Sequence, residues 1–164
     1  MRHVYLDTET TGFSAATDRI VEIAVVDDTG AVLLDTLVNP ERQIPEAVTA
    51  HVHGITDEMV SGQPTLAELL PRLREVLAGR PLVIYNADFD LRFLPAEVQD
   101  APSVVHCCLK RFRKHVARRK LAVKSRNLTT AAELAGHRWE GAAHRALADT
   151  QATRTVWRWL DVQE

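Results

Sequence analysis

The sequence Asp7-Thr8-Glu9 follows directly on the apolar run Val4-Tyr5-Leu6, and this stretch constrains the fold more than any other. A short run of β-branched, aromatic and aliphatic residues is typical of a buried strand. Two carboxylates that leave a strand end two residues apart point to the same side. Like charges this close repel one another, and burial strengthens the repulsion. Either the stretch is a strand that simply ends in a polar turn, or a cation lies between the carboxylates.

The chemistry of the available side chains favours Mg²⁺ or Mn²⁺ as that cation. Carboxylate oxygens are hard ligands, which these ions prefer. The histidines and cysteines lack the spacing of a zinc finger. The sequence therefore predicts an oxygen-ligated metal site at the end of the first strand.

Length and composition predict a single domain over residues 1–164, with 46% hydrophobic and 26% charged residues. The net charge of −2 says little about partners, but the charges are unevenly distributed. Residues 101–132 contain no Asp or Glu and hold nine of the twenty Lys and Arg residues. Surface helices that are merely solvated usually mix the two signs. We expect this basic stretch to bind a phosphate backbone, with a solvated surface as the alternative.

Hydrophobic periodicity and turn residues predict an α/β fold with a mixed five-stranded sheet flanked by helices. The expected strands are 4–6, 19–26, 31–38, 82–85 and 103–107, and Asp27 to Gly30 joins the second and third as a hairpin. The expected helices are 46–52, a short one after Thr56, 65–78, 88–94, the start of the basic stretch, 128–135 and 145–160. The ends of the first and fourth strands should open into the same crevice.

Two further polar clusters lie at element ends. The fourth strand leads into Asn86-Ala87-Asp88-Phe89-Asp90, and His144 and Asp149 lie where the last helix begins. Residues 141–143 are small, so we expect a flexible approach to His144. Taken singly, Asp88 reads as a helix N-cap, Asp149 as an exposed helix residue and His144 as a surface histidine.

The ordered set Asp7-x-Glu9, Asn86-Ala87-x-Phe89-Asp90 and His144-x4-Asp149 resembles the DEDDh family of 3′–5′ exonucleases, which have a ribonuclease H-like fold. The resemblance runs from about Val4 to Thr155 and includes Val52-His53-Gly54-Ile55-Thr56. There are two departures. Tyr85 stands where the family often has histidine, and Cys107-Cys108 where many members have Asp-Thr.

The resemblance implies two-metal hydrolysis with two Mg²⁺ ions, for which Mn²⁺ substitutes. Asp7, Glu9 and Asp149 would hold the first ion. Asp7 would bridge to the second, which Asp90 holds directly or through water. His144 would be the general base, a suitable role because free imidazole titrates near pH 6.5.

The resemblance also suggests residues that contact the substrate. The 3′-terminal nucleotide would lie against Thr10, Thr11 and Phe13, with His53 and Asn86 from the neighbouring motifs. Phe13 as simple loop packing is the alternative. Upstream phosphates would contact the basic stretch, through Lys114, Arg118 and Arg119, with few stacking contacts because Phe112 is the one aromatic residue there.

These observations together predict a stand-alone exonuclease that acts on single-stranded nucleic acid, with DNA favoured over RNA. The alternatives are an exoribonuclease, a proofreading subunit with a DNA polymerase as partner, and a binding module that has lost the chemistry. Repair, proofreading and RNA processing all remain open as pathways. The adjacent cysteines make a disulfide framework improbable, and neither a signal segment nor a run of about 18 apolar residues occurs. We therefore expect a cytoplasmic protein that does not enter a membrane.

Overall fold

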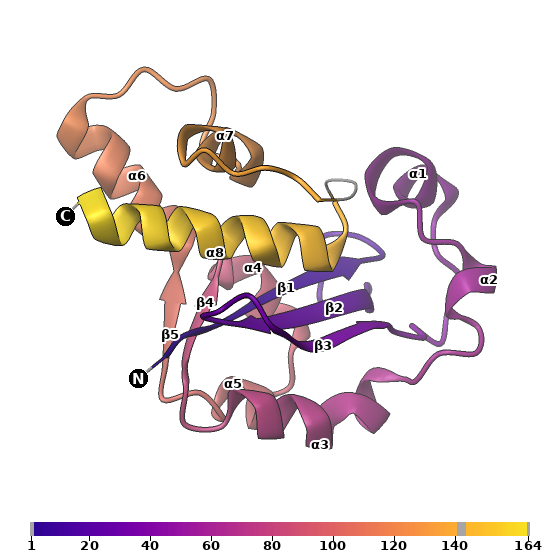
Figure 1. Cartoon of the computed structure of the whole chain (residues 1–164). Helices are drawn as coiled ribbons and strands as arrows, with labels where there is room; N and C mark the ends of the chain where they lie inside the picture. The colour runs from indigo at the N-terminus through magenta and orange to yellow at the C-terminus, as the bar shows by residue number, and fades with distance from the viewer. Residues whose placement is uncertain (1, 141–143, 164) are drawn as a thin grey trace.

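The computed structural model describes residues 2–140 and 144–163, and Figure 1 shows a central sheet with helices packed against it. The strands lie in the order β3-β2-β1-β4-β5. The pairs β1–β2 and β2–β3 are antiparallel, whereas β1–β4 and β4–β5 are parallel. The mixed five-stranded sheet is confirmed, with strands β1 (Val4–Thr10), β2 (Ile20–Asp27), β3 (Val32–Leu37), β4 (Pro81–Ile84) and β5 (Val104–Cys107).

Two groups of helices cover the two faces of the sheet (Figure 1). One face packs against α3 (Leu66–Leu77) and α5 (Ala96–Gln99), and the other against α6 (Cys108–Arg119), α7 (Leu128–Leu134) and α8 (Ala146–Gln163). The shorter helices are α1 (Glu46–Val48), a π-helical turn (Thr49–His53), α2 (Asp57–Val60), α4 (Ala87–Asp90) and a 3₁₀ turn (Leu91–Phe93). Within the described residues, no helix has the length and apolar character that crossing a membrane requires.

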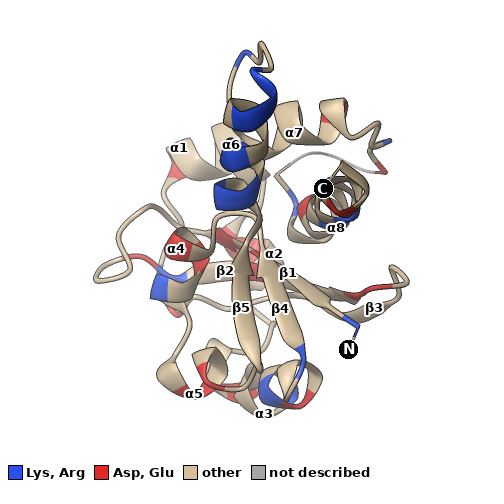
Figure 2. Cartoon of the chain, turned by 90° about the vertical axis from the view of Figure 1, so that its left-hand side faces the viewer, with Lys and Arg blue, Asp and Glu red and all other residues tan. Residues whose placement is uncertain are grey.

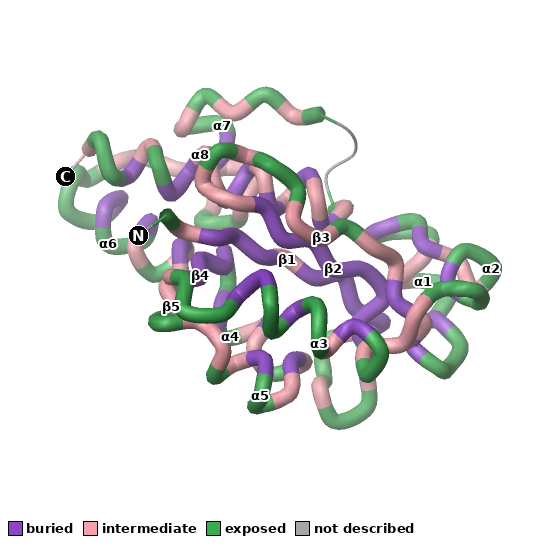
Figure 3. The backbone as a smooth tube through the Cα atoms, turned by 60° about the horizontal axis from the view of Figure 1, so that its bottom comes forward, coloured by how far each residue is buried: buried purple, intermediate pink, exposed green. Residues whose placement is uncertain are grey.

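Strand β1 lies in the middle of the core and is buried along most of its length, as Figure 3 shows. Val4 and Leu6 pack in the apolar cluster beneath α3, whereas Tyr5 packs in the cluster beneath α8. Since side chains alternate along a strand, Asp7 and Glu9 continue the row that Tyr5 begins. The alternation therefore aims both carboxylates at α8.

The first strand is longer than the sequence predicted, because it continues through the acidic pair to Thr10. Its parallel partner β4 pairs only as far as Leu6, opposite Ile84, and then turns into α4. On the other side β2 pairs with β1 throughout, with Glu22 opposite Glu9. Asp7 and Glu9 therefore lie in the part of β1 that pairs with β2 but no longer with β4.

Other differences from the predicted elements are local. The helix expected over 46–52 is three residues of α-helix followed by the π-helical turn, and that expected over 88–94 is α4 followed by the 3₁₀ turn. Helix α5 was not predicted, because four residues after Pro95 carry too little periodicity to detect. The predicted helix start at Thr56 is confirmed, since its hydroxyl caps α2.

Candidate active site

Three carboxylates converge where β1 meets the start of α8. Each of Asp7, Glu9 and Asp149 places one ligand atom within 4.8 Å of those of the other two. Asp7 and Glu9 come from the α8-facing side of β1, and Asp149 comes from the first turn of α8. These carboxylate oxygens are a donor set that fits a hard divalent cation.

Asp90 approaches from the other side of β1, at the end of α4. Its carboxylate is buried and accepts a hydrogen bond of 2.8 Å from the hydroxyl of Thr8. It is not a member of the close group of three. Its charge is nevertheless the largest electrostatic influence of a neighbour on Asp7. The first and fourth strand ends thus come together as predicted, because β4 leaves the sheet beside Asp7.

Burial raises the pKa of all four of these carboxyl groups, and repulsion from their acidic neighbours adds to the effect at Asp7 and Glu9. Burial is the largest cause, and it raises the pKa of Asp90 and of Asp149 to about 6. Burial, followed by repulsion from Asp149, raises the pKa of Glu9 to about 8. Asp7 has its pKa raised well above the usual range, by burial and by its acidic neighbours. A bound divalent cation would relieve this repulsion.

His144 lies at the approach to α8, with an exposed side chain. Its backbone is left-handed, with φ of 62°, and its N–H donates to Oδ1 of Asp149 at 3.3 Å. The local fold thus ties the histidine directly to one of the clustered carboxylates. The expected flexible approach over residues 141–143 lies outside the described residues.

The segment after β1 is a loop held by one carboxylate. Asp18 accepts hydrogen bonds from the hydroxyl of Thr11 at 3.1 Å and from the N–H of Ser14 at 2.9 Å. Gly12 lies so close to this carboxylate that a Cβ there would be 2.5 Å from an oxygen of Asp18. Phe13 lies within this loop, and its side chain is 82% exposed. Phe13 is therefore not part of the core.

Thr10 and His53 are joined beneath this loop. The His53 ring is buried, and its Nδ1 accepts the N–H of Ile55 at 3.0 Å. Its Nε2 must then carry the proton, which it donates to the carbonyl of Thr10 at 3.2 Å. Burial lowers the pKa of His53, which favours this neutral form. His53 thus contacts the main chain that follows the acidic pair, and Thr10 donates its hydroxyl to the carbonyl of Gly12 at 2.7 Å.

In the segment Asn86-Ala87-Asp88-Phe89-Asp90, the structure contradicts the prediction of which residue caps the helix. Helix α4 begins at Ala87, so Asn86 occupies the N-cap position, although its exposed side chain makes no capping hydrogen bond. The interpretation of Asp88 as the N-cap is wrong. Asp88 is exposed and forms an ion pair of 2.8 Å with Lys110.

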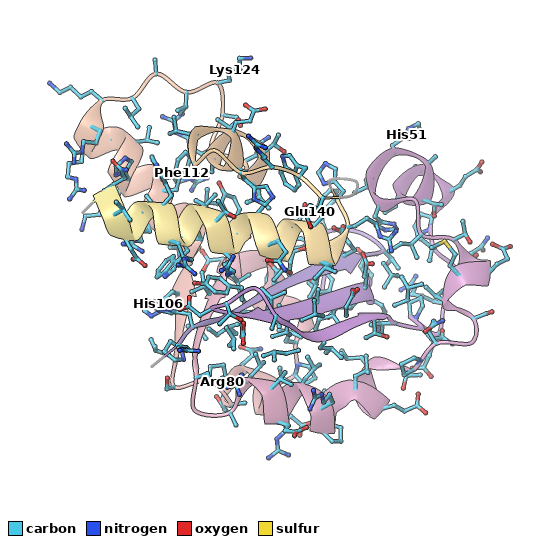
Figure 4. All side chains as sticks on the ribbon, viewed as in Figure 1. His51, Arg80, His106, Phe112, Lys124 and Glu140 are labelled. Atoms are coloured by element: carbon cyan, nitrogen blue, oxygen red, sulfur yellow. The ribbon has the colours of Figure 1, made fainter. Side chains whose placement is uncertain are left out.

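The same ion pair places the basic stretch. Lys110 belongs to the first turn of α6, so this helix starts beside α4, and Figure 2 shows its blue residues continuing away from the sheet. Lys114 and Arg118 follow at intervals of four, which puts them on the same helix face, and both are exposed. Arg119 instead donates to the carbonyl of Gln163 at 3.0 Å. Lys124, labelled in Figure 4, lies farther off, on the loop between α6 and α7.

Sequence reasoning missed Glu22, a buried carboxylate on β2 that binds Arg145. Its signal was present, since Glu22 is the one polar residue before the terminal aspartate of the strand Ile20–Asp27. What that signal lacked was the strand register, which places Glu22 opposite Glu9.

Comparisons with solved structures show which class of protein this fold belongs to. An exonuclease I from Methylocaldum szegediense has a TM-score of 0.81 at 21% identity, over 99% of this chain and 41% of that one. A zinc-bound complex of Escherichia coli exonuclease I with single-stranded DNA has a TM-score of 0.78 at 18% identity, over 99% of this chain and 41% of the other. The predicted ribonuclease H-like fold is confirmed.

The family follows from sequence. The model of the RNase_T exonuclease family matches residues 4–156, and this chain belongs to that family. An uncharacterized exonuclease of Escherichia phage 186 is 36% identical over 92% of this chain and 83% of its own length. The DNA polymerase III subunit epsilon of Treponema pallidum is 42% identical over 56% of this chain, but only 44% of that protein is covered. Exonucleases of this family generally depend on a divalent metal ion.

The raised pKa values predict how pH and metal affect stability. Unfolded carboxyl groups titrate near pH 4, whereas Glu9 titrates at about 8 and Asp90 and Asp149 at about 6 in the folded chain. The metal-free folded state therefore keeps protons that the unfolded state loses. Without metal, the cluster should lower the free energy of unfolding as pH rises from about 4 to 8. Urea unfolding in chelator at pH 5 and pH 8 measures this.

The matched variants are Glu9→Gln, which removes a clustered charge, and Glu97→Gln, which removes an exposed one on α5. Glu9→Gln should stabilise the metal-free protein at pH 8, whereas Glu97→Gln should change little. Added Mg²⁺ should raise the melting temperature of the wild type more at pH 8 than at pH 5. If Glu9→Gln were no more stable than wild type in chelator at pH 8, the repulsion argument would be wrong.

Proposed function

We propose that this protein is a magnesium-dependent 3′–5′ exonuclease that removes nucleotides from the ends of single-stranded DNA. The observation that carries the proposal is the convergence of Asp7, Glu9 and Asp149 beside a buried Asp90, with His144 at the rim. Such a cluster suits phosphodiester hydrolysis better than binding alone, because bare carboxylates would repel a nucleic acid.

In the proposed mechanism, Asp7, Glu9 and Asp149 would hold one Mg²⁺ ion, and Asp7 and Asp90 would hold a second. Bound ions of this kind activate water as a nucleophile and stabilise a leaving oxygen. His144 would accept one proton of the attacking water. The oxygen of that water bonds to phosphorus as the bond from phosphorus to the 3′ oxygen breaks, and the released 3′ oxygen takes a proton from solvent. The hydrogen bond from Thr8 fixes the orientation of the Asp90 carboxylate before any ion arrives.

The aromatic residues beside the site support an unpaired strand end as substrate. Phe13 and Phe89 face one another edge to face, with ring centroids 6.3 Å apart. Arg92 lies over the Phe89 ring, with its guanidinium carbon 5.3 Å from the centroid. Exposed aromatic rings bind bases by stacking, which requires a base that is free of its partner strand. Thr10 and Thr11 lie at the base of the same loop, where the carbonyl of Thr10 accepts from His53 and the N–H of Thr11 donates to the carbonyl of Arg19 at 2.8 Å.

RNA is the second candidate substrate. The fold does not choose between the two, because the structure of a 3′-exonuclease that recognises the histone mRNA stem-loop also matches, with a TM-score of 0.73 at 19% identity. A DNA polymerase partner is a further candidate, by similarity to the epsilon subunits. The decisive assay follows end-labelled single-stranded DNA, duplex DNA and RNA of one sequence, with Mg²⁺, with Mn²⁺ and with chelator.

Stepwise shortening of single-stranded DNA from its 3′ end, lost in chelator, is the expected result. His144→Ala should lower that rate roughly 10²–10⁴-fold, the usual contribution of general acid–base catalysis. Full activity in excess chelator would overturn the metal mechanism. Faster hydrolysis of RNA would replace the substrate and leave the mechanism in place.

Asp90 and Asp88 provide a matched pair of substitutions. Asp90→Asn should nearly abolish hydrolysis, because it removes a buried metal-facing charge. Asp88→Asn should cost little activity or stability, because it removes only an exposed ion pair with Lys110, a type worth about 0–1 kcal/mol. Both variants are assayed side by side at saturating Mg²⁺. An inactive Asp88→Asn with an active Asp90→Asn would move the second metal ligand by two residues.

The basic face of α6 should contact phosphates upstream of the cut. Changing Lys114 and Arg118 together to Gln should weaken binding to long strands and flatten its salt dependence. The expected loss is roughly 0.7 of a log–log slope unit for each phosphate contact. Cleavage of a dinucleotide should barely change, because so short a substrate cannot extend along α6.

The control for this double variant is Arg72→Gln with Arg74→Gln, which removes the same charge from α3, on the opposite face of the sheet. It should leave the salt slope unchanged. Equal slopes in all three proteins would mean that the basic face is a solvated surface.

A further inference from the structure

Glu22 is a buried carboxylate beside the cluster that the proposed mechanism does not use. It lies on β2 directly opposite Glu9, and its side chain is only 5% exposed. It is nevertheless absent from the group of carboxylates whose oxygens converge. A buried charge of this kind is stable only when it is paired and hydrogen-bonded.

The partners of Glu22 come from the start of α8. The guanidinium of Arg145 donates from Nη2 to Oε1 at 2.7 Å and from Nε to both carboxylate oxygens at 3.1 Å. The backbone N–H of Ala146 donates to Oε2 at 2.9 Å. Ala146 is the first residue of α8, where N–H groups have no partner within the helix. Glu22 thus caps α8 from a neighbouring strand.

This contact fixes the segment that carries two site residues. Asp149 lies one turn after Ala146, and the exposed His144 lies two residues before it. The left-handed backbone of His144, which a residue with a Cβ adopts only at some cost in energy, immediately precedes the arginine. Its N–H donates to Asp149, so the turn closes on itself. The first turn of α8 is therefore held at its start by Glu22, and beside the site by the hydrogen bond between His144 and Asp149.

The rest of α8 is attached independently. Gln151 donates to the carbonyl of Gly30 at 2.9 Å, and Arg154 donates to the carbonyl of Asp28 at 2.9 Å. Val156 and Leu160 are fully buried against the sheet. Figure 1 shows the helix lying along the sheet, with its first turn over the ends of β1 and β2. Loss of the Glu22 contact would release the first turn while the remainder stays docked.

We propose that Glu22 and Arg145 are a positioning pair, which sets the first turn of α8 so that Asp149 reaches Asp7 and Glu9 and His144 faces the substrate. The pair touches neither the metal nor the substrate. This role rests on the proposed function. In this role, metal binding by Asp149 depends on the ion pair between Arg145 and Glu22, and Glu22 lies on β2.

The test compares Arg145→Ala and Arg145→Lys with Arg154→Ala as the matched control. Both arginines join α8 to β2 or its following turn, but only Arg145 holds the first turn. Calorimetric titration with Mn²⁺, without substrate, measures metal binding by each protein. Assays on a short single-stranded DNA oligomer give kcat and KM, and melting temperatures show whether each variant folds.

Arg145→Ala should weaken Mn²⁺ binding and lower kcat, each roughly 10–100-fold, as is usual when a supporting hydrogen bond is lost at a metal site. KM should change little. Arg145→Lys, which keeps the charge but not the two-pronged contact, should recover part of both. Arg154→Ala should keep Mn²⁺ binding and kcat within about twofold of wild type, even where it lowers the melting temperature.

Normal Mn²⁺ binding and kcat in Arg145→Ala would overturn the positioning role. An equal loss of Mn²⁺ binding and kcat in Arg154→Ala would also overturn it, because it would show that the site depends on the general docking of α8. The Mn²⁺ titration also separates the two proposals. A wild type that binds Mn²⁺ but hydrolyses no strand end refutes the proposed function alone, and the pair is then judged by metal binding in its variants. An active wild type with unaffected variants refutes the pair alone.

Discussion

Repulsion among carboxylates held on one face of β1 is the constraint on which this structure depends. Asp7 and Glu9 are fixed by the alternation of a strand whose other residues form the core, so neither can move without disturbing that strand. Helix α8 is pressed onto the same face by Val156 and Leu160 and brings Asp149 against them. Apolar packing thus forces together charges that would otherwise separate. Burial, followed by repulsion from Asp149, accordingly raises the pKa of Glu9 to about 8.

The parts of this arrangement that follow from local sequence were predictable. Period-two alternation placed Asp7 and Glu9 on one face, and the order of motifs assigned Asp90 and Asp149 to the same edge of the sheet. The end of the first strand was not predicted, because Asp7 to Thr10 are polar and still pair with β2. The N-cap of α4 was predicted two residues too late, at Asp88. The observed start of α4 at Ala87 places Asn86 in the N-cap position.

The contacts around the site could not be predicted from the sequence, because they join residues that are far apart along the chain. Glu22 and Arg145 are 123 residues apart, and they meet only because β2 pairs with β1 in one register and α8 crosses both. His53 was predicted to be a substrate-binding residue, and the structure shows that both of its ring nitrogens contact main chain. A residue type and its spacing indicate that a side chain is polar and near a site. They do not indicate which of its atoms remain free after the chain has folded.

The fold neutralises its buried carboxylates in two ways, and the difference fits the proposed chemistry. Glu22 receives a permanent cation, the Arg145 guanidinium, together with a backbone N–H, so its oxygens are occupied. Within the described residues, Asp7, Glu9 and Asp149 have no guanidinium of their own, although Asp149 accepts the N–H of His144. Arg145 only moderates the raised pKa of Glu9. A built-in arginine at all of these positions would give a more stable protein without an open ligand position. In the proposed mechanism, the fixed guanidinium would support the site, whereas the converging oxygens would be left to an exchangeable metal ion that can also bind substrate and water.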